Sequence, residues 1–304
     1  MLHLQNIYQK TFMSPYFFTI AIRKKRGNLC FEDQEYKPDF VIPANHRDWC
    51  ADPILAEDKG QTFLFYEAVH DSVGRIEVAQ IFDDCHISKP TVILSGDHHY
   101  SYPFVFRMNG TWYMIPESSS QKEVCLYEAV EFPYHWRKSQ ILLTSPFVDT
   151  TVMQFEGQYY ILSFCPQKDN EGVSGRAYRL SLGASIQLEP IAWNEQNALE
   201  IRGAGMPFTM ANRLIRPAQK SRLHEYGDGL VFYDAKPSRN DYCESCCGTF
   251  LAENIKVPGY QINGAHTYCI SSKYEVIDIR CRSFELTKIP CSLKRKFSSK
   301  LTAN

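Results

Sequence analysis

The sequence repeats one plan at intervals of about 50 residues. Each copy is a short apolar run, a turn that contains glycine and an aromatic-rich run, and the clearest copies are Asp52–Ala68, Tyr102–Ser118 and Asp149–Phe164. Their first residues are 50 and 47 positions apart. Because another β-rich stretch follows each copy, the unit holds about four strands, which is the signature of a β-propeller blade. We therefore predict an all-β fold.

The spacing predicts a single five-bladed propeller over residues 1–291. The blades are expected at residues 50–98, 100–146, 148–196, 204–258 and 264–285, the last completed by strands from residues 14–45. A blade shared by the two chain ends closes the ring and removes free sheet edges, which otherwise promote aggregation. Residues 292–304 form a basic tail that we expect to be frayed.

The composition argues against several classes of protein. Lys and Arg total 33 against 34 Asp and Glu, a formal net charge of -1, so the chain lacks the basic field of nucleic-acid and anionic-membrane binders. The early apolar run at residues 16–22 is shorter than the roughly 20 residues of a membrane span. Basic residues follow this run, whereas they precede the apolar segment of a signal peptide. We expect no nucleic-acid partner and no membrane span.

The cysteines favour a reducing compartment. They number 11, an odd count, and are scattered, which is typical of free thiols. The one cluster, Cys243, Cys246 and Cys247, lacks the second Cys or His pair of a structural zinc site. We therefore expect a cytoplasmic protein without a metal or cofactor.

Propeller topology predicts a cluster of carboxylates. In an antiparallel blade the inner strand begins, and the second strand ends, on the same face of the disc. The residues that this rule brings to one mouth of the central channel are Asp52, Tyr102, Asp149, His266, Glu67, Glu117 and Gln219. Each carboxylate alone fits a turn or a solvated strand end. Together they indicate a site, because like charges placed close together are costly unless a function uses them.

Two of these carboxylates suit the cleavage of a glycosidic bond, which needs an acid and a base or nucleophile. We assign Asp52 as base and Glu117 or Asp149 as acid. Asp52 and Asp149 belong to blades one and three, which predicts the wider, inverting separation. Glu117 follows an apolar strand, so desolvation should raise its pKa, whereas Asp52 at an open strand start should stay ionised.

Sugar recognition also calls for aromatic platforms and planar donors. Trp49 and Tyr102 are the predicted platforms, and we expect Tyr102→Ala to weaken glycan binding with little effect on the fold. Arg202 and Arg216 are predicted to bind an anionic group, with pairing to a structural carboxylate as the alternative. The predicted substrate-binding set is completed by Glu67, Gln219 and His266. The adjacent His98 and His99 are expected at the surface.

The order of several motifs resembles a known family. The motifs are ADP…FLFYE, YPFVF…GTWYMIPES, VDTTVMQFEGQYYIL, RPAQ…YGDGL and GAHTY…YEVID, between about residues 48 and 280. This order resembles the propeller domain at the amino terminus of plant glucosamine inositolphosphorylceramide transferases and of bacterial surface-polysaccharide proteins. That domain is similar to five-bladed glycoside hydrolases of the arabinanase and xylosidase kind. The resemblance implies a glycan or sugar-nucleotide ligand.

The resemblance also implies roles for three positions. In those hydrolases a base Asp opens blade one, where Asp52 stands. A second Asp opens blade two and an acid Glu opens blade three, but this chain has Tyr102 and Asp149 there. The resemblance therefore supports a carbohydrate ligand more firmly than a reaction.

Three hypotheses follow. The first is glycosyl cleavage or transfer in cell-surface polysaccharide or glycolipid metabolism. The second is a non-catalytic glycan-binding module that serves a partner glycosyltransferase. The third is an interaction propeller whose mouth carboxylates only bind a cation.

Overall fold

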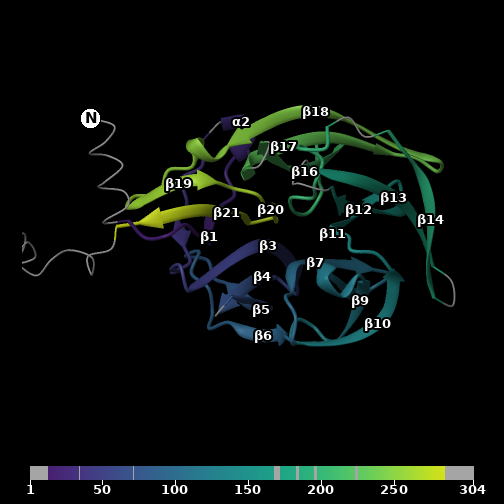
Figure 1. The fold of residues 1–304 in the computed structure, drawn as a ribbon, viewed down its shortest axis with the longest axis horizontal. Coiled ribbons are helices and arrows are strands. Elements are labelled where there is room, and N and C mark those ends of the chain that lie inside the picture. The colour runs from purple at the N-terminus through teal and green to yellow at the C-terminus, as the bar shows by residue number, and fades with distance from the viewer. Residues whose placement is uncertain are drawn as a thin grey trace, which may run out of the picture.

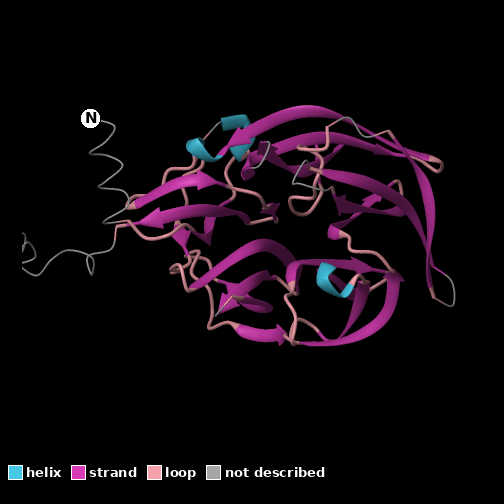
Figure 2. Cartoon of the chain, in the orientation of Figure 1, coloured by secondary structure: helices cyan, strands magenta, loops and turns pink. Residues whose placement is uncertain are grey.

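The computed structural model describes residues 13–284, apart from 34, 71, 168–171, 183–184, 195–196 and 223–224. Within this part strands dominate, and helix is limited to α2 (Cys30–Asp33) and the short 3-10 turns η1 (Ser119–Gln121) and η3 (Ala252–Asn254) (Figure 2). The all-β prediction is confirmed. The predicted basic tail, residues 292–304, lies outside the described residues.

Two sheets are antiparallel meanders of four strands. The first contains β3 (Asp48–Asp58), β4 (Gln61–His70), β5 (Val73–Ile81) and β6 (Thr91–Leu94). The second contains β7 (Ser101–Met108), β8 (Thr111–Glu117), β9 (Val124–Glu131) and β10 (His135–Leu143). In both, the spatial order of the strands follows the chain, because short turns join consecutive antiparallel strands.

A third sheet of eight strands consists of two such meanders joined at their outer edges. One meander contains β11 (Val148–Phe155), β12 (Gln158–Pro166), β13 (Val173–Leu182) and β14 (Ile186–Trp193). The other contains β15 (Phe208–Met210), β16 (Arg213–Arg222), β17 (Glu225–Pro237) and β18 (Asp241–Leu251). The joint is a short parallel pairing of β14 with β18, at Ala192–Asp241 and Trp193–Tyr242.

The last sheet combines strands from both ends of the described chain. It contains β19 (Tyr260–Gly264), β20 (Tyr268–Ile270), β21 (Tyr274–Ser283), β1 (Phe17–Lys24) and β2 (Phe40–Val41). β1 pairs with β21 in antiparallel register from Phe17–Cys281 to Lys24–Tyr274. In β1 the five consecutive residues 19–23 are buried, and the apolar ones among them add hydrophobic contact to the backbone hydrogen bonds.

The sheets lie side by side around a common centre (Figure 1). β3 contacts β7 and β20, and β7 contacts β11, so these strands form the inner layer. The hydrophobic core lies between neighbouring sheets; its largest cluster joins side chains such as Phe65, Phe104 and Ile161 from three successive meanders. Burial of these faces is the main stabilising contribution to the arrangement.

Three inner strands share one irregularity near their start. Asp52, Tyr102 and Asp149 have φ angles of 54°, 41° and 45°, and the pairing with the next strand shifts register at the same place in each. A left-handed conformation in a non-glycine residue costs about 1–3 kcal/mol and persists only where the surroundings enforce it, commonly at functional sites. The fold thus places three equivalent strained residues at one end of the inner strands.

Candidate functional site

The carboxylates of Asp52, Glu67, Glu117 and Asp149 gather at this end, which we call the carboxylate mouth. The negative charges of Glu67 and Asp149 both act to raise the pKa of Asp52, and those of Asp149 and Asp52 act in the same direction on Glu117. The sequence rule that strand starts and strand ends share a face therefore brings these four side chains together.

Asp52 is held by two neighbouring sheets. Its Oδ2 accepts a hydrogen bond from the Tyr102 backbone N–H at 3.1 Å, and its Oδ1 accepts one from Thr267 Oγ1 at 2.8 Å. Burial raises the pKa of Asp52 to about 7, although the neighbouring His266 opposes this. The expectation that Asp52 stands at an open strand start is wrong, because its side chain is 5% exposed and is covered by β7 and the segment before β20.

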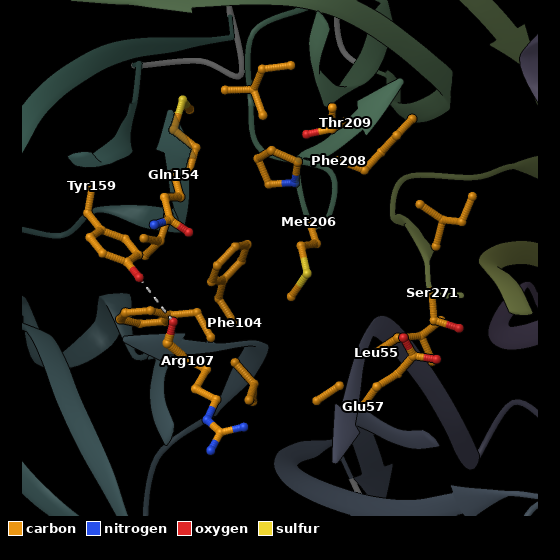
Figure 3. A pocket seen from close by; sticks show the side chains of 18 of the residues that line it. Leu55, Glu57, Phe104, Arg107, Gln154, Tyr159, Met206, Phe208, Thr209 and Ser271 are labelled. Carbon is orange, nitrogen blue, oxygen red and sulfur yellow. Dashed lines mark hydrogen bonds between the residues drawn. The ribbon is translucent and has the colours of Figure 1, made fainter. Parts of the chain in front are cut away.

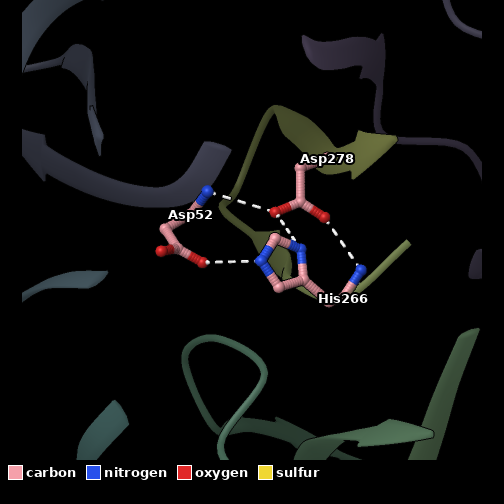
Figure 4. Close-up of side chains that lie close together, drawn as sticks. All are labelled: Asp52, His266 and Asp278. Carbon is pink, nitrogen blue, oxygen red and sulfur yellow. Dashed lines mark hydrogen bonds and ion pairs between the residues drawn. The ribbon is translucent and has the colours of Figure 1, made fainter. Parts of the chain in front are cut away.

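His266 lies between two aspartates (Figure 4). Its Nδ1 is 2.6 Å from Asp278 Oδ2, and its Nε2 is 3.4 Å from Asp52 Oδ1. Burial alone would lower the pKa of His266, but Asp278 and Asp52 raise it to about 9. The imidazole is therefore protonated near neutral pH and neutralises part of the carboxylate charge.

The same three side chains are the candidate metal ligands among the described residues. Ligand atoms of Asp52, His266 and Asp278 all lie within 4.8 Å of one another. A metal-bound histidine is neutral, so a cation would have to displace the proton of His266. Asp278 also accepts hydrogen bonds from the backbone N–H groups of His266 and Thr267, each at 2.9 Å.

Asp149 is anchored by residues that follow the third meander. Its Oδ2 accepts hydrogen bonds from Arg202 Nε and from Gln219 Nε2, the latter at 2.8 Å. Gln219 also donates to the Gly203 carbonyl at 2.9 Å. Asp149 and Gln219 are buried, whereas the Arg202 side chain is 24% exposed. Arg202 is therefore the member of this group that a ligand can reach.

Glu117, at the end of β8, is mostly covered but keeps some contact with solvent. Its Oε1 accepts a hydrogen bond from Ser119 Oγ at 3.1 Å and its Oε2 one from the Asp149 N–H at 3.3 Å. Burial raises the pKa of Glu117 well above its usual range; Asp149 raises it further, and Arg202 opposes the rise. Because its side chain is 13% exposed, Glu117 keeps contact with solvent at the mouth.

His99 is at the surface, as expected, with its side chain 46% exposed, and it also contacts the mouth. Its Nε2 lies 2.7 Å from Glu67 Oε1, and its Nδ1 accepts the Gly74 N–H at 3.0 Å. A backbone N–H can only donate, so the proton is on Nε2, facing the buried Glu67. A Cβ at Gly74 would lie 2.6 Å from His99 Cε1 and 2.8 Å from Glu67 Oε1, so a side chain there would disrupt the pair.

The sequence holds weak signals for His99 and Asp278, the two residues of the mouth that the motifs do not predict as site residues. His99 comes just before the second repeat copy, where a loop returns to the mouth. Asp278 is one of two carboxylates within the apolar run of β21, the other being Glu275, and both side chains are fully buried. A buried acid needs a partner.

Two predicted ligand-binding residues have internal roles instead. Arg216 is fully buried and donates to Glu244 at 2.8 and 2.7 Å and to the Ile201 carbonyl at 3.0 Å. It therefore pairs with a structural carboxylate, which was the predicted alternative to binding an anionic ligand. The Tyr102 ring is also fully buried, and its hydroxyl shares a 3.0 Å hydrogen bond with Thr151 Oγ1 and accepts the Gly205 N–H at 2.8 Å. The predicted stacking role of Tyr102 is therefore wrong, because the bulge directs its ring into the core.

Trp49 remains near the mouth. Its ring packs on Phe18 with centroids 5.8 Å apart, and Phe18 in turn contacts the His266 ring at 4.7 Å. Trp49 is partly exposed, and Phe18 links it to His266. It is the aromatic group of the predicted set that a ligand can contact.

Tyr102→Phe should lower the free energy of unfolding by about 1–2 kcal/mol, because Thr151 Oγ1 and the Gly205 N–H lose a buried partner. Urea denaturation checks this value. Tyr134→Phe, on an exposed ring, is the matched control and should change stability by less than about 0.5 kcal/mol. Equal stability of both variants would show that the Tyr102 hydroxyl does not support the mouth.

Solved structures define the class of fold. The chain is similar to the structure of RS223 β-xylosidase, with a TM-score of 0.56 and 10% identity over 78% of this chain and 92% of that one. It is also similar to a β-1,2-mannobiose phosphorylase from Listeria innocua, with a TM-score of 0.56 and 12% identity over 86% and 96% of the two chains. At these identities the similarity shows the fold alone, which is that of a β-propeller.

The sequence comparison gives the particular family. The family described as glucosamine inositolphosphorylceramide transferase 1, N-terminal, matches residues 39–271, and this chain belongs to it. The resemblance predicted from the motifs is confirmed. Glucosamine inositolphosphorylceramide transferase 1 from Oryza sativa subsp. indica is 30% identical over 208 residues, which are 65% of this chain and 28% of the relative. The match thus spans well under half of that protein.

No helix in the described part of the chain has the length and apolar character needed to cross a membrane.

Proposed function

We propose that this chain is a five-bladed propeller that binds a glycan or activated sugar at the carboxylate mouth and cleaves or transfers a glycosyl group there. The pathway would be that of a cell-surface polysaccharide or glycolipid. The observation that carries the proposal is Glu117, a partly buried acid of raised pKa that still reaches solvent beside Asp149 and Arg202. The family and the propeller fold support a carbohydrate ligand.

In the proposed step Glu117 gives its proton to the leaving oxygen as the glycosidic C–O bond breaks. Water or an acceptor hydroxyl forms the new bond to the anomeric carbon and loses its proton to Asp52. A pKa of about 7 suits a base that works near neutral pH, since proton transfer is most efficient when the two match. Arg202 lies 3.7 Å from Glu117 Oε2 and would stabilise the carboxylate that Glu117 becomes.

A non-catalytic glycan-binding module serving a partner glycosyltransferase is the second candidate. Two observations favour it: the side chains of Asp52 and Asp149 are nearly inaccessible to solvent, and their hydrogen bonds go to neighbouring parts of the fold. In this case the exposed part of the mouth, His99, Arg202 and Glu117, would bind a sugar without turnover.

Glu117→Gln should reduce kcat/KM by at least about 100-fold, the effect expected from loss of a general acid. The assay incubates the purified protein with oligosaccharides and nucleotide sugars and detects products by mass spectrometry. Glu131→Gln, with a side chain 70% exposed, is the matched control and should retain full activity. If turnover is found and Glu117→Gln keeps it, the acid role passes to Asp149. Binding without turnover of any compound would favour the module.

A further inference from the structure

A cavity lies near the later ends of the inner strands, away from the carboxylate mouth. Figure 3 shows side chains that line it. Its volume is about 390 Å³, within the roughly 300–1,000 Å³ of ligand pockets. Later residues of the inner strands line it, including Glu57 of β3. Glu57 lies five positions after Asp52, and at about 3.3 Å per strand residue the two regions are roughly 16 Å apart.

The rim of this distal cavity is a ring of polar side chains, one from each strand unit. Glu57, Arg107, Gln154 and Ser271 each lie five positions after a residue at the mouth end, namely Asp52, Tyr102, Asp149 and His266. Thr209 of β15 completes the ring. All five are exposed or partly exposed. The repeat that collects carboxylates at one end thus collects a mixed set of donors and acceptors at the other.

The interior of the distal cavity is apolar. Phe104 and Met206 project between the ring residues (Figure 3), and Leu55 and Val152 also line the wall. The Trp112 ring, a further lining group, is fixed by stacking on Phe132 with centroids 4.3 Å apart. The cavity therefore offers a rigid apolar surface beneath polar groups.

The ring keeps capacity for a ligand. Among the described residues, the side chains of Gln154 and Thr209 have no hydrogen-bond partner. Arg107 uses Nε for the Gly110 carbonyl at 3.1 Å, and its guanidinium has further N–H donors. Glu57 and Arg107 carry opposite charges and both have internal partners: Arg107 lies 3.7 Å from Asp58 Oδ1, and Glu57 accepts hydrogen bonds from the Ser272 N–H, at 3.2 Å, and from Ser272 Oγ. The ring therefore presents no unpaired charge that would select an anion or a cation.

We propose that the distal cavity is a second binding site, for a neutral polyhydroxylated ligand such as a sugar ring. Planar amide, guanidinium and carboxylate groups can each bridge neighbouring hydroxyls, which both donate and accept. The C–H face of the ring would pack on Phe104 and Met206. The proposal concerns a different end of the channel from the mouth and does not depend on turnover there.

The test is saturation-transfer NMR titration with D-glucose, D-mannose, D-galactose and D-xylose, added singly to the full chain. At least one sugar should bind, and Gln154→Ala should weaken it by about tenfold, as loss of a bidentate contact predicts. Gln187→Ala, at an exposed position, is the matched control. Thr209→Trp should abolish binding by filling the cavity, and circular dichroism would verify that each variant is folded.

Several outcomes would overturn the proposal. These are the absence of binding by all four sugars, binding that survives Thr209→Trp, or displacement of the sugar by 1-hexanol at equal concentration, which would indicate an apolar ligand. A sugar signal removed by Glu117→Gln but not by Gln154→Ala would place the sugar at the mouth. That result would refute the distal site while leaving the proposed function standing.

Discussion

Replacing Arg216 by methionine should lower the free energy of unfolding by about 3–5 kcal/mol. Methionine has a similar length, but it leaves Glu244, whose side chain is 7% exposed, without its counter-charge. A buried carboxylate stripped of its partner must either remain charged in a poorly solvating site or take up a proton. The Ile201 carbonyl would also lose its hydrogen bond from Nη1.

Urea denaturation of the variant and the parent measures the difference. Arg213→Met is the matched control, because Arg213 lies at the exposed start of the same strand, and its effect should stay within about 0.5 kcal/mol. The double variant Arg216→Met with Glu244→Leu should recover part of the loss, since no charge is then left buried. A loss below about 1 kcal/mol in Arg216→Met would contradict a structural ion pair and return Arg216 to the candidate ligand-binding residues.

Stability should fall as the pH rises from about 6.5 to about 9, owing to His266. Its pKa is raised from 6.5 to about 9 in the folded chain by Asp278 and Asp52, so the folded state binds the proton more tightly than the unfolded state. The stabilisation is complete below pH 6.5 and is lost as the pH passes the folded-state pKa. A difference of this size corresponds to at most about 3 kcal/mol.

Thermal melts in a series of buffers test this dependence. His266→Gln should remove most of the slope between pH 6.5 and 9, whereas His135→Gln, with a side chain 70% exposed, should leave it intact. Asp52 affects stability in a lower pH range. Its pKa is raised from 3.8 to about 7 in the folded chain, so it also makes stability fall as the pH rises, between pH 3.8 and about 7. An unchanged slope in His266→Gln would mean that the imidazolium does not support the fold.

Much of the mouth could be predicted because strand ends are determined by the pattern of apolar runs and turns. Asp52, Glu117 and Asp149 stand at such ends, and antiparallel pairing alone puts these ends on one face. The sequence also indicated that Glu117 would be desolvated, since it follows an apolar run, and the raised pKa agrees. Periodicity therefore determined the strands, their common face and the acids that it collects.

Only the tertiary structure decided which of these side chains a ligand can reach. Tyr102 and Arg216 turn inward to partners on other strands, while His99 reaches Glu67 from a loop whose path no local pattern specifies. The charge of His266 likewise depends on Asp52 and Asp278, which are 214 and 12 residues away in the chain. Burial and pairing of polar groups result from long-range contacts, and a pattern of neighbouring residues contains no information on such distances.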